Sequence, residues 1–247
     1  MKVLASYNIK GGVGKTTSAV NLAYCSANEG QRTLLIDLDP QAAATFYFRM
    51  DSPHKLGTRL FLESDWDRFT LASDFKNLNV LPADFSFRKM EHVLEKMKGQ
   101  ETEITSRFRS LEDHYDVVIF DCPPNFTRLT LQVFMLSDQI VCPVIPTTLS
   151  LRTLAQMTRS LKKRTWLSAT IAPYFSMAEK RKTMHRQVVH LIRNGRIKGL
   201  PPFLKTLIPF MADIEKMGLY RNPLPHFLPK SRAAQAYENL WTEIKSI

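Results

Sequence analysis

Several features that define other classes of protein are scarce or missing in this sequence of 247 residues. Its three cysteines, Cys25, Cys122 and Cys142, are widely spaced and include no CxxC pair, so we expect reduced thiols and neither a disulfide scaffold nor an iron–sulfur site. No apolar stretch approaches the roughly 18 residues needed to cross a bilayer. The strand-like segment that begins almost at Met1 leaves no room for a signal peptide, so we expect a cytoplasmic protein.

The chain also lacks internal repeats, low-complexity tracts and any stretch typical of a linker between domains. Its 44% hydrophobic and 23% charged residues are ordinary for a folded protein, which excludes a disordered or collagen-like chain. A chain of this length can form one large domain. We therefore predict a single domain over residues 1–247.

Acidic residues are few in the second part of the chain. Residues 1–150 contain 16 Lys/Arg and 18 Asp/Glu, whereas residues 151–247 contain 18 Lys/Arg and 5 Asp/Glu. The net charge of +11 is therefore concentrated after residue 150. Such a one-sided charge indicates a polyanionic partner, either nucleic acid or an anionic membrane. The alternative is a charge that only keeps the protein soluble.

Short apolar runs alternate with helical patterns along the chain, and the runs are rich in Val, Ile and Leu, as in strands buried on both faces. This alternation predicts a doubly wound α/β fold, with a mostly parallel sheet flanked by helices. The expected strands are Val3–Tyr7, Thr33–Asp37, Val117–Asp121, Gln139–Pro143, Ala169–Pro173 and Thr206–Ile208. The expected helices are Thr16–Glu29, Phe87–Lys98, Leu151–Arg164, Met184–Arg193 and Ala233–Ile244.

A glycine-rich segment, Lys10-Gly11-Gly12-Val13-Gly14-Lys15-Thr16-Thr17, follows the first expected strand and opens the first expected helix. Glycines let successive backbone N–H groups turn toward phosphate oxygens without interference from Cβ atoms. In this pattern Lys15 reaches the terminal phosphates and the Thr16 hydroxyl coordinates Mg²⁺. The ordinary pattern has a glycine at position 9, where this chain has Ile9, and a second lysine, Lys10, precedes the glycines. The segment predicts a phosphate-binding loop.

This loop resembles the deviant Walker A motif of the ParA/MinD family of ATPases, and the resemblance extends over essentially the whole chain. The other matching segments are Asp37–Gln41 (DxDPQ in the family), Val117–Pro124 (the Walker B strand and DCPP), Met177–Arg181 (a segment ending in Asp-x-Arg, here with Glu179) and Ser231–Ile244 (the terminal helix of small ParA proteins). The resemblance implies the P-loop NTPase fold.

The resemblance also implies roles for single residues, with ATP and Mg²⁺ as cofactors. Lys10 corresponds to the signature lysine that reaches the partner's nucleotide across an ATP-sandwich homodimer. Lys15 and the backbone of Gly11–Thr17 hold the phosphates, and Asp39 positions the attacking water. The metal residues are Thr16, which binds Mg²⁺ directly, and Asp37 and Asp121, which support it. The alternative for Asp37 and Asp39 is a plain turn at the end of a strand, because Asp favours turns.

For the basic part of the chain, the resemblance implies non-specific binding to double-stranded DNA. The residues expected to contact DNA phosphates are Arg181, Lys182, Arg186, Lys230 and Arg232. Each of them is alternatively a solvated surface charge. Two departures from the family pattern bear on this site: Asp213 stands where several relatives carry an arginine, and Phe210-Met211 replaces an Arg-Asn pair, which leaves the adenine contacts open.

The function implied is an ATPase that dimerises on ATP, binds nucleoid DNA and is released when a ParB-like or cargo-adaptor protein stimulates hydrolysis. Such a cycle segregates or positions a cargo, which is a plasmid, a chromosome or a carboxysome-like body. The alternative is a MinD-like ATPase on a membrane. We expect no stable membrane association, because the apolar face of the last helix is typical of packing on the domain and only Lys245 adds a basic residue near its end. A metabolic ligase of the same fold is a further alternative.

Overall fold

The computed structural model describes residues 1–52, 56–60, 66–90, 92, 94, 108 and 111–247. Its strands are β1 (Lys2–Ser6), β2 (Thr33–Asp37), β3 (Leu71–Ala72), β4 (Leu78–Leu81), β5 (Val117–Asp121), β6 (Gln139–Val144), β7 (Thr170–Ala178) and β8 (Leu207–Pro209). Its α-helices are α1 (Lys15–Asn28), α2 (Ala43–Tyr47), α3 (Leu56–Arg59), α6 (Arg128–Leu136), α7 (Thr148–Lys162), α8 (Thr183–Arg193), α9 (Ala212–Tyr220), α10 (Leu224–Phe227) and α11 (Arg232–Lys245). Two 3₁₀ helices cover Asp67–Phe69 and Phe85–Lys89.

Within the described residues, the strands form one sheet in the order β3-β4-β2-β5-β1-β6-β7-β8. Neighbouring strands are parallel except β3 and β4, which are antiparallel. The register places Asp121 of β5 between Ser6 of β1 and Asp37 of β2. The loops that follow these three strands therefore open at the same edge of the sheet, where ligands bind in open α/β folds. The predicted α/β fold with a mostly parallel sheet is confirmed.

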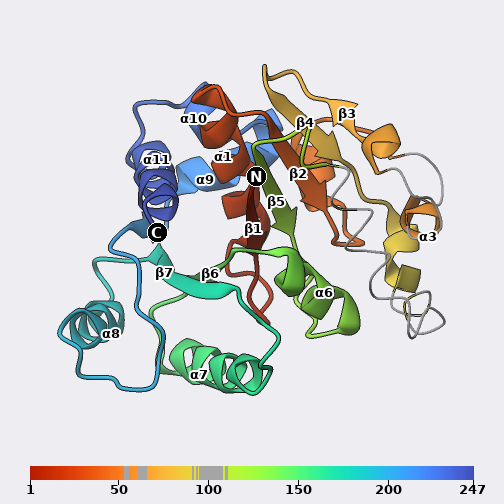
Figure 1. Ribbon diagram of the computed structural model, residues 1–247. Helices are drawn as coiled ribbons and strands as arrows, with labels where there is room; N and C mark the ends of the chain where they lie inside the picture. The colour runs from red at the N-terminus through yellow and green to blue at the C-terminus, as the bar shows by residue number, and fades with distance from the viewer. Residues whose placement is uncertain (53–55, 61–65, 91, 93, 95–107, 109–110) are drawn as a thin grey trace.

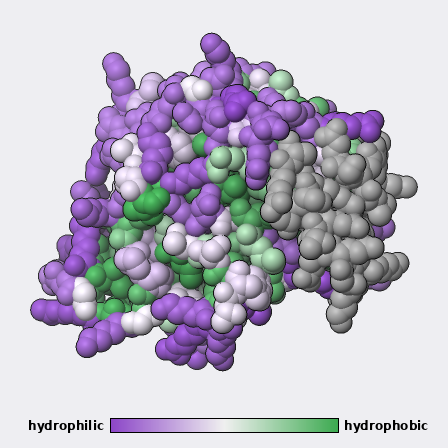
Figure 2. All heavy atoms as spheres, viewed as in Figure 1, coloured by the Kyte–Doolittle hydropathy of each residue, from purple (hydrophilic) through white to green (hydrophobic). Residues whose placement is uncertain are grey.

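Helices cover both faces of the sheet, with α1, α9, α10 and α11 on one side and α6, α7 and α8 on the other (Figure 1). Each face has its own core. Val20 and Leu22 of α1 pack with Leu240 and Trp241 of α11 in one of them. Because both faces are covered, β1, β2 and β5 are apolar along nearly their whole length instead of alternating. In Figure 2 hydrophilic residues dominate the rim of the visible face, and hydrophobic residues reach the surface nearer its centre and lower left.

The last helix is tied to the first strand and the first helix. The Nζ of Lys2 donates to the carbonyl oxygens of Ile244 and Ile247, at 2.6 and 3.2 Å. The carboxylate of Glu29, which follows α1, accepts from Trp241 Nε1 at 2.9 Å and from Lys245 Nζ at 2.6 Å. The two ends of the chain consequently lie close together (Figure 1).

The expected elements are present with shifted bounds, and several were not predicted. The expected strand Ala169–Pro173 continues to Ala178 as β7, because it lies between β6 and β8 in the sheet. The start of the expected helix Phe87–Lys98 is the 3₁₀ helix Phe85–Lys89, and residues 91, 93 and 95–98 lie outside the described residues. Strands β3 and β4 and helices α2, α3, α6, α9 and α10 were missed.

Candidate nucleotide-binding and catalytic site

The segment between β1 and α1 forms an open backbone loop. Gly12 and Gly14 have φ angles of 68° and 94°, which glycine adopts without strain. A Cβ atom added to Gly11 or Gly12 would meet no heavy atom within 4 Å, so the space beside these residues is open. Helix α1 starts at Lys15 with no side-chain cap on its first amide groups. Free amides at a helix N-terminus beside an open glycine loop form an anion site.

Asn8 holds the entrance of this loop and was missed by the sequence analysis. Its buried side chain accepts a hydrogen bond from the backbone N–H of Lys10 at 2.9 Å and donates to the carbonyl of Pro143 in β6 at 2.7 Å. The loop is thereby fixed to the neighbouring strand. The only sequence signal is a polar residue at the end of an apolar strand.

The two lysines of the loop lie in different surroundings. Lys15 is buried, and its Nζ donates to the carbonyl of Lys10 at 3.1 Å. Burial lowers the pKa of Lys15, while the nearby carboxylates of Asp121 and Asp39 raise it. Lys10 is half-buried, and its Nζ lies 3.4 Å from Oγ of Ser150 near the start of α7. The Lys10 side chain therefore contacts a residue of its own chain in this structure, and its action across a dimer stays a prediction.

Three carboxylates lie at the carboxyl ends of β2 and β5, at the edge of the sheet next to the loop. Asp37 is fully buried and accepts hydrogen bonds from the Thr45 backbone at 2.9 Å, the Thr45 hydroxyl at 2.8 Å and the Asp39 backbone at 3.1 Å. Burial raises the pKa of Asp37 to about 6, although the hydrogen bonds from Thr45 and Asp39 oppose the shift. Asp37 thus fixes the turn that presents Asp39. Thr45 was not singled out in the sequence, because only the fold brings it to Asp37.

Asp121 lies beside Asp37 in the sheet and has no such support. Both of its carboxylate oxygens are buried without a hydrogen-bond partner of good geometry among the described residues. Burial raises the pKa of Asp121 well above its usual range, and the charge of Asp37 adds to the shift, whereas the Thr16 hydroxyl lowers it. Because Thr16 and the ammonium group of Lys15 offset this burial only in part, the carboxylate requires a proton or a further cation.

These residues fit the expected Mg²⁺. The orphaned oxygens of Asp121, the Thr16 hydroxyl and the open glycine loop form an oxygen-rich site at the edge of the sheet. Among the described residues, no group of three or more His, Cys, Asp and Glu side chains is arranged as a metal cage. Mg²⁺ does not need one, because it commonly uses one or two protein ligands together with substrate phosphates and water.

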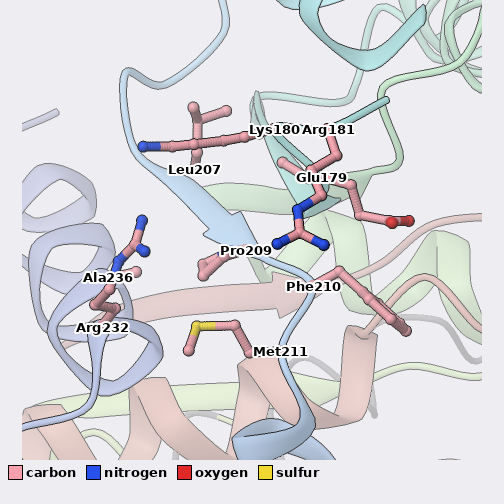
Figure 3. Close-up of a pocket in the computed structure, with 10 residues that line it drawn as sticks. Glu179, Lys180, Arg181, Leu207, Pro209, Phe210, Met211, Arg232 and Ala236 are labelled. Atoms are coloured by element: carbon pink, nitrogen blue, oxygen red, sulfur yellow. The ribbon is translucent and has the colours of Figure 1, made fainter. Parts of the chain in front are cut away.

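A cavity of about 490 Å³ opens at the carboxyl ends of β7 and β8. Strand β7 lies between the cavity and the loop: its last residue, Ala178, lines the cavity, and a Cβ on Gly14 would lie 3.1 Å from Oγ of its Ser176. Figure 3 shows the guanidinium groups of Arg181 and Arg232 turned toward the cavity from two sides, and Phe210 and Met211 also line it.

The structure brings together only some of the residues expected to bind DNA. Within the described part of the chain, Arg181 and Arg232 make no side-chain hydrogen bond or ion pair, although both line the cavity. Lys182 pairs with Glu179 at 2.5 Å, and Arg186 lies 3.3 Å from the Thr183 hydroxyl. Lys230 is exposed, just before α11. Asp213 pairs with Lys216 at 2.9 Å.

A family model described as an AAA domain matches residues 1–168 of this chain. The sporulation initiation inhibitor protein Soj of Bacillus subtilis is 30% identical over 250 residues, covering 98% of each chain. Among solved structures, cobyrinic acid a,c-diamide synthase from Mycobacterium smegmatis, with bound ADP and magnesium, has a TM-score of 0.81 at 26% identity, over 99% of this chain and 94% of that one. The cell division ATPase MinD of Pyrococcus furiosus has a TM-score of 0.75 at 23% identity, over 99% and 98%, which shows a shared fold.

Proposed function

This chain belongs to the ParA/MinD type of P-loop ATPases, and we propose that it hydrolyses ATP with Mg²⁺ to partition or position a cargo. The observation that supports this proposal best is the orphaned carboxylate of Asp121 beside Asp37, Lys15 and the open glycine loop. A metal–phosphate ligand would add a second cation beside this carboxylate, whose burial Lys15 offsets only in part.

We assign the steps of hydrolysis to residues that surround the loop. The amides of Gly11–Thr17 and the ammonium group of Lys15 bind the phosphates of ATP and stabilise charge on the transferred phosphoryl group. Asp39 orients the attacking water, and the hydrogen bonds through Asp37 keep its backbone in place. Thr16 and the carboxylate of Asp121 would hold Mg²⁺, which would supply positive charge beside the phosphate oxygens. Lys10 leaves Ser150 to reach the nucleotide of a second copy.

The cavity beside the loop supports both a nucleoside site and a polyanion site. Strand β7, which ends at the cavity, also contacts Gly14 of the loop, and the cavity wall holds two arginines without acidic partners. We propose that ATP-dependent dimers bind double-stranded DNA non-specifically through Arg181 and Arg232, with Lys182, Arg186 and Lys230 around them. The cycle then runs on the nucleoid in the cytoplasm as a single-domain ATPase, and a ParB-like or cargo-adaptor protein stimulates hydrolysis.

The MinD-like alternative depends on a free amphipathic helix, and the packing of α11 is against it. Tyr237, Leu240, Trp241 and Ile244 are all buried in the core beneath α11. Within the described part of the chain, no helix combines the length and apolar character required to span a membrane.

A second candidate is an ATP-dependent ligase that forms amides from carboxylic acids. The observation in its favour is the likeness over nearly the whole chain to a protein named as a diamide synthase. Two unpaired guanidinium groups facing one cavity also suit a carboxylate substrate. ATP turnover in the absence of any acid or amide donor would contradict this candidate.

The first test is hydrolysis by purified protein. Lys15→Ala is expected to lose nucleotide binding, because the phosphates lose their cation. Asp39→Ala is expected to bind ATP as the parent does and to lose turnover, because only the water is misplaced. Normal hydrolysis by the Asp39 variant would refute its assignment.

The second test is co-sedimentation with arbitrary duplex DNA and with anionic liposomes, using ATP or ADP at two salt concentrations. We expect binding to DNA with ATP only, and log K should fall with log salt by about 0.9 for each phosphate contacted. Arg181→Glu should weaken binding equally for unrelated sequences. The matched control is Arg196→Glu, at an exposed arginine outside the cavity. Equal binding with ADP and ATP, or recruitment to liposomes, would contradict the DNA proposal.

A further inference from the structure

Two arginines connect the C-terminal ends of two short helices, because each follows one helix and donates a hydrogen bond to a carbonyl of the other. The Nη2 of Arg49, just after α2, donates to the carbonyl of Tyr220, the last residue of α9, at 2.9 Å. The Nε of Arg221, just after α9, donates to the carbonyl of Phe46 in α2 at 2.9 Å. The guanidinium of Arg221 also lies over the Phe46 ring, 4.4 Å from its centroid. Each arginine thus satisfies a carbonyl at the C-terminal end of the other helix, and we call this pair the arginine exchange.

Helix α2 cannot hold its own position. It has five residues, too few for a stable isolated helix, and left-handed residues flank it: Ala42 with φ of 52° and Arg49 with φ of 57°. Its place is therefore set by contacts with its surroundings. Ala44 packs in the core with α1, Thr45 at the centre of α2 is bound to the carboxylate of Asp37, and Phe46 near its end accepts from Arg221.

On the α2 side, the arginine exchange lies close to Asp39 of the candidate site along the chain. Asp39 lies four residues before α2, and its carbonyl accepts the N–H of Ala42 at 2.8 Å. Burial raises the pKa of Tyr47, at the end of α2, and a hydrogen bond with the Thr17 side chain of the loop opposes that shift. A displacement of α2 would therefore move the backbone that presents Asp39.

On the α9 side, the arginine exchange lies at the end of a helix that starts next to the cavity. Helix α9 starts at Ala212, directly after Phe210 and Met211, which line the cavity. Its buried Met217 packs on α1, where the Nδ2 of Asn21 lies 3.3 Å from the Met217 sulfur. The arginine exchange thus joins the segment that carries Asp39 to the segment that lines the cavity, and α1 supports both.

We propose that Arg49 and Arg221 are positioning residues for hydrolysis. They keep Asp39 in the correct place relative to a nucleotide whose nucleoside lies in the cavity. This inference rests on the proposed ATPase function and adds to it two residues that touch neither phosphate nor metal. Its chemical basis is that a misplacement of about 1 Å at a reacting group can lower a rate by about 100-fold, whereas binding made by other groups persists.

The experiment measures kcat, KM and nucleotide affinity for Arg221→Ala, Arg49→Ala, the double variant and Arg221→Lys. We expect each alanine variant to lower kcat by about 10- to 100-fold, with KM and nucleotide affinity within about twofold of the parent. The double variant should have a kcat no lower than that of the less active single variant. The two residues act through one connection, so their effects should not add. Arg221→Lys should restore much of the rate, because it can still donate to the Phe46 carbonyl.

The matched control is Arg193→Ala. Arg193 is also an exposed arginine that donates to a backbone carbonyl, that of Lys205 at 3.2 Å, but it lies at the end of α8. Its variant should keep the parent's kcat. Alanine variants with unchanged kcat, or with equal losses of rate and nucleotide affinity and a lower melting temperature, would overturn the proposal. A parent without turnover would contradict the ATPase function itself, and this outcome is visible before any variant is compared.

Discussion

Replacing Asp121 by asparagine should stabilise the nucleotide-free protein while abolishing its response to magnesium nucleotide. Asp121 is buried, and neither of its carboxylate oxygens has a hydrogen-bond partner of good geometry among the described residues. Asparagine has nearly the same shape and no charge, so the variant removes the cost of keeping a buried carboxyl group either charged or protonated. The neighbouring Asp37 gains as well, because a repulsive charge beside it disappears.

The size of the effect follows from this lack of partners. An unsatisfied buried polar group costs about 1–3 kcal/mol, and more if it is charged. For a chain of 150–250 residues, each kcal/mol changes the melting temperature by about 2–4 °C. Asparagine still buries a polar group, so only about 1 kcal/mol of this cost is regained, and we expect Asp121→Asn to raise the melting temperature by about 2–4 °C without ligand. The parent should instead gain about 2.7 kcal/mol from magnesium nucleotide at 100 times its dissociation constant, and the variant little.

The assay is thermal unfolding in EDTA, in Mg²⁺ alone, and in Mg²⁺ with ADP. Asp138→Asn is the control, because Asp138 is exposed and already accepts the N–H of Val3 at 2.7 Å, so its replacement should not stabilise the protein. A variant that is less stable than the parent in EDTA, or that gains as much from magnesium nucleotide, would refute this account of Asp121.

The remaining predictions concern the loop and its surroundings. Lys10→Ala should bind ATP as the parent does but form no productive dimer in sedimentation with ATP, and normal dimerisation and turnover would contradict its role across the dimer. Gly14→Ala should lower the melting temperature, because its φ is positive and its Cβ would crowd Ser176, whereas Gly11→Ala should keep stability and weaken nucleotide binding measured by calorimetry, because its Cβ would enter open space. Without nucleotide, the free energy of unfolding should fall as pH rises from about 4 to 6, because the folded state, in which the pKa of Asp37 is about 6, holds a proton that the unfolded chain has released. Asp37→Asn should reduce this slope in denaturant titrations without abolishing it, because the raised pKa of Asp121 contributes in the same direction.

Much of the fold could be predicted because the sequence of each central strand is by itself typical of a buried strand. β1, β2 and β5 are short apolar runs with no alternation, which a sheet covered on both faces requires. The missed elements lack such a signal. β3 has two residues and α2 has five, so neighbouring elements determine their conformation instead of local propensity.

The residues of the candidate site likewise fall into those with a local sequence pattern and those without one. The residues of the phosphate loop are consecutive in the sequence, and glycine is the residue type that adopts positive φ angles without strain. Gly12 and Gly14 could therefore be identified directly. Asn8 acts through a carbonyl 135 residues away, and Arg221 acts through one 175 residues away. Neither residue has a local pattern that distinguishes it from an ordinary surface or strand-end residue. Such contacts depend on which strands become neighbours, and the sequence pattern does not encode that choice in any one segment.

The attachment of α11 to β1 and α1 has a consequence for synthesis on the ribosome. Trp241, Leu240 and Ile244 form part of the core beneath α1, yet Trp241 follows Glu29, its partner next to α1, by 212 residues. Until they emerge, the apolar side of α1 stays exposed and Lys2 lacks its partners on Ile244 and Ile247. Domains fold as cooperative units. Nascent chains stalled before residue 233 should therefore be sensitive to protease and should bind chaperones.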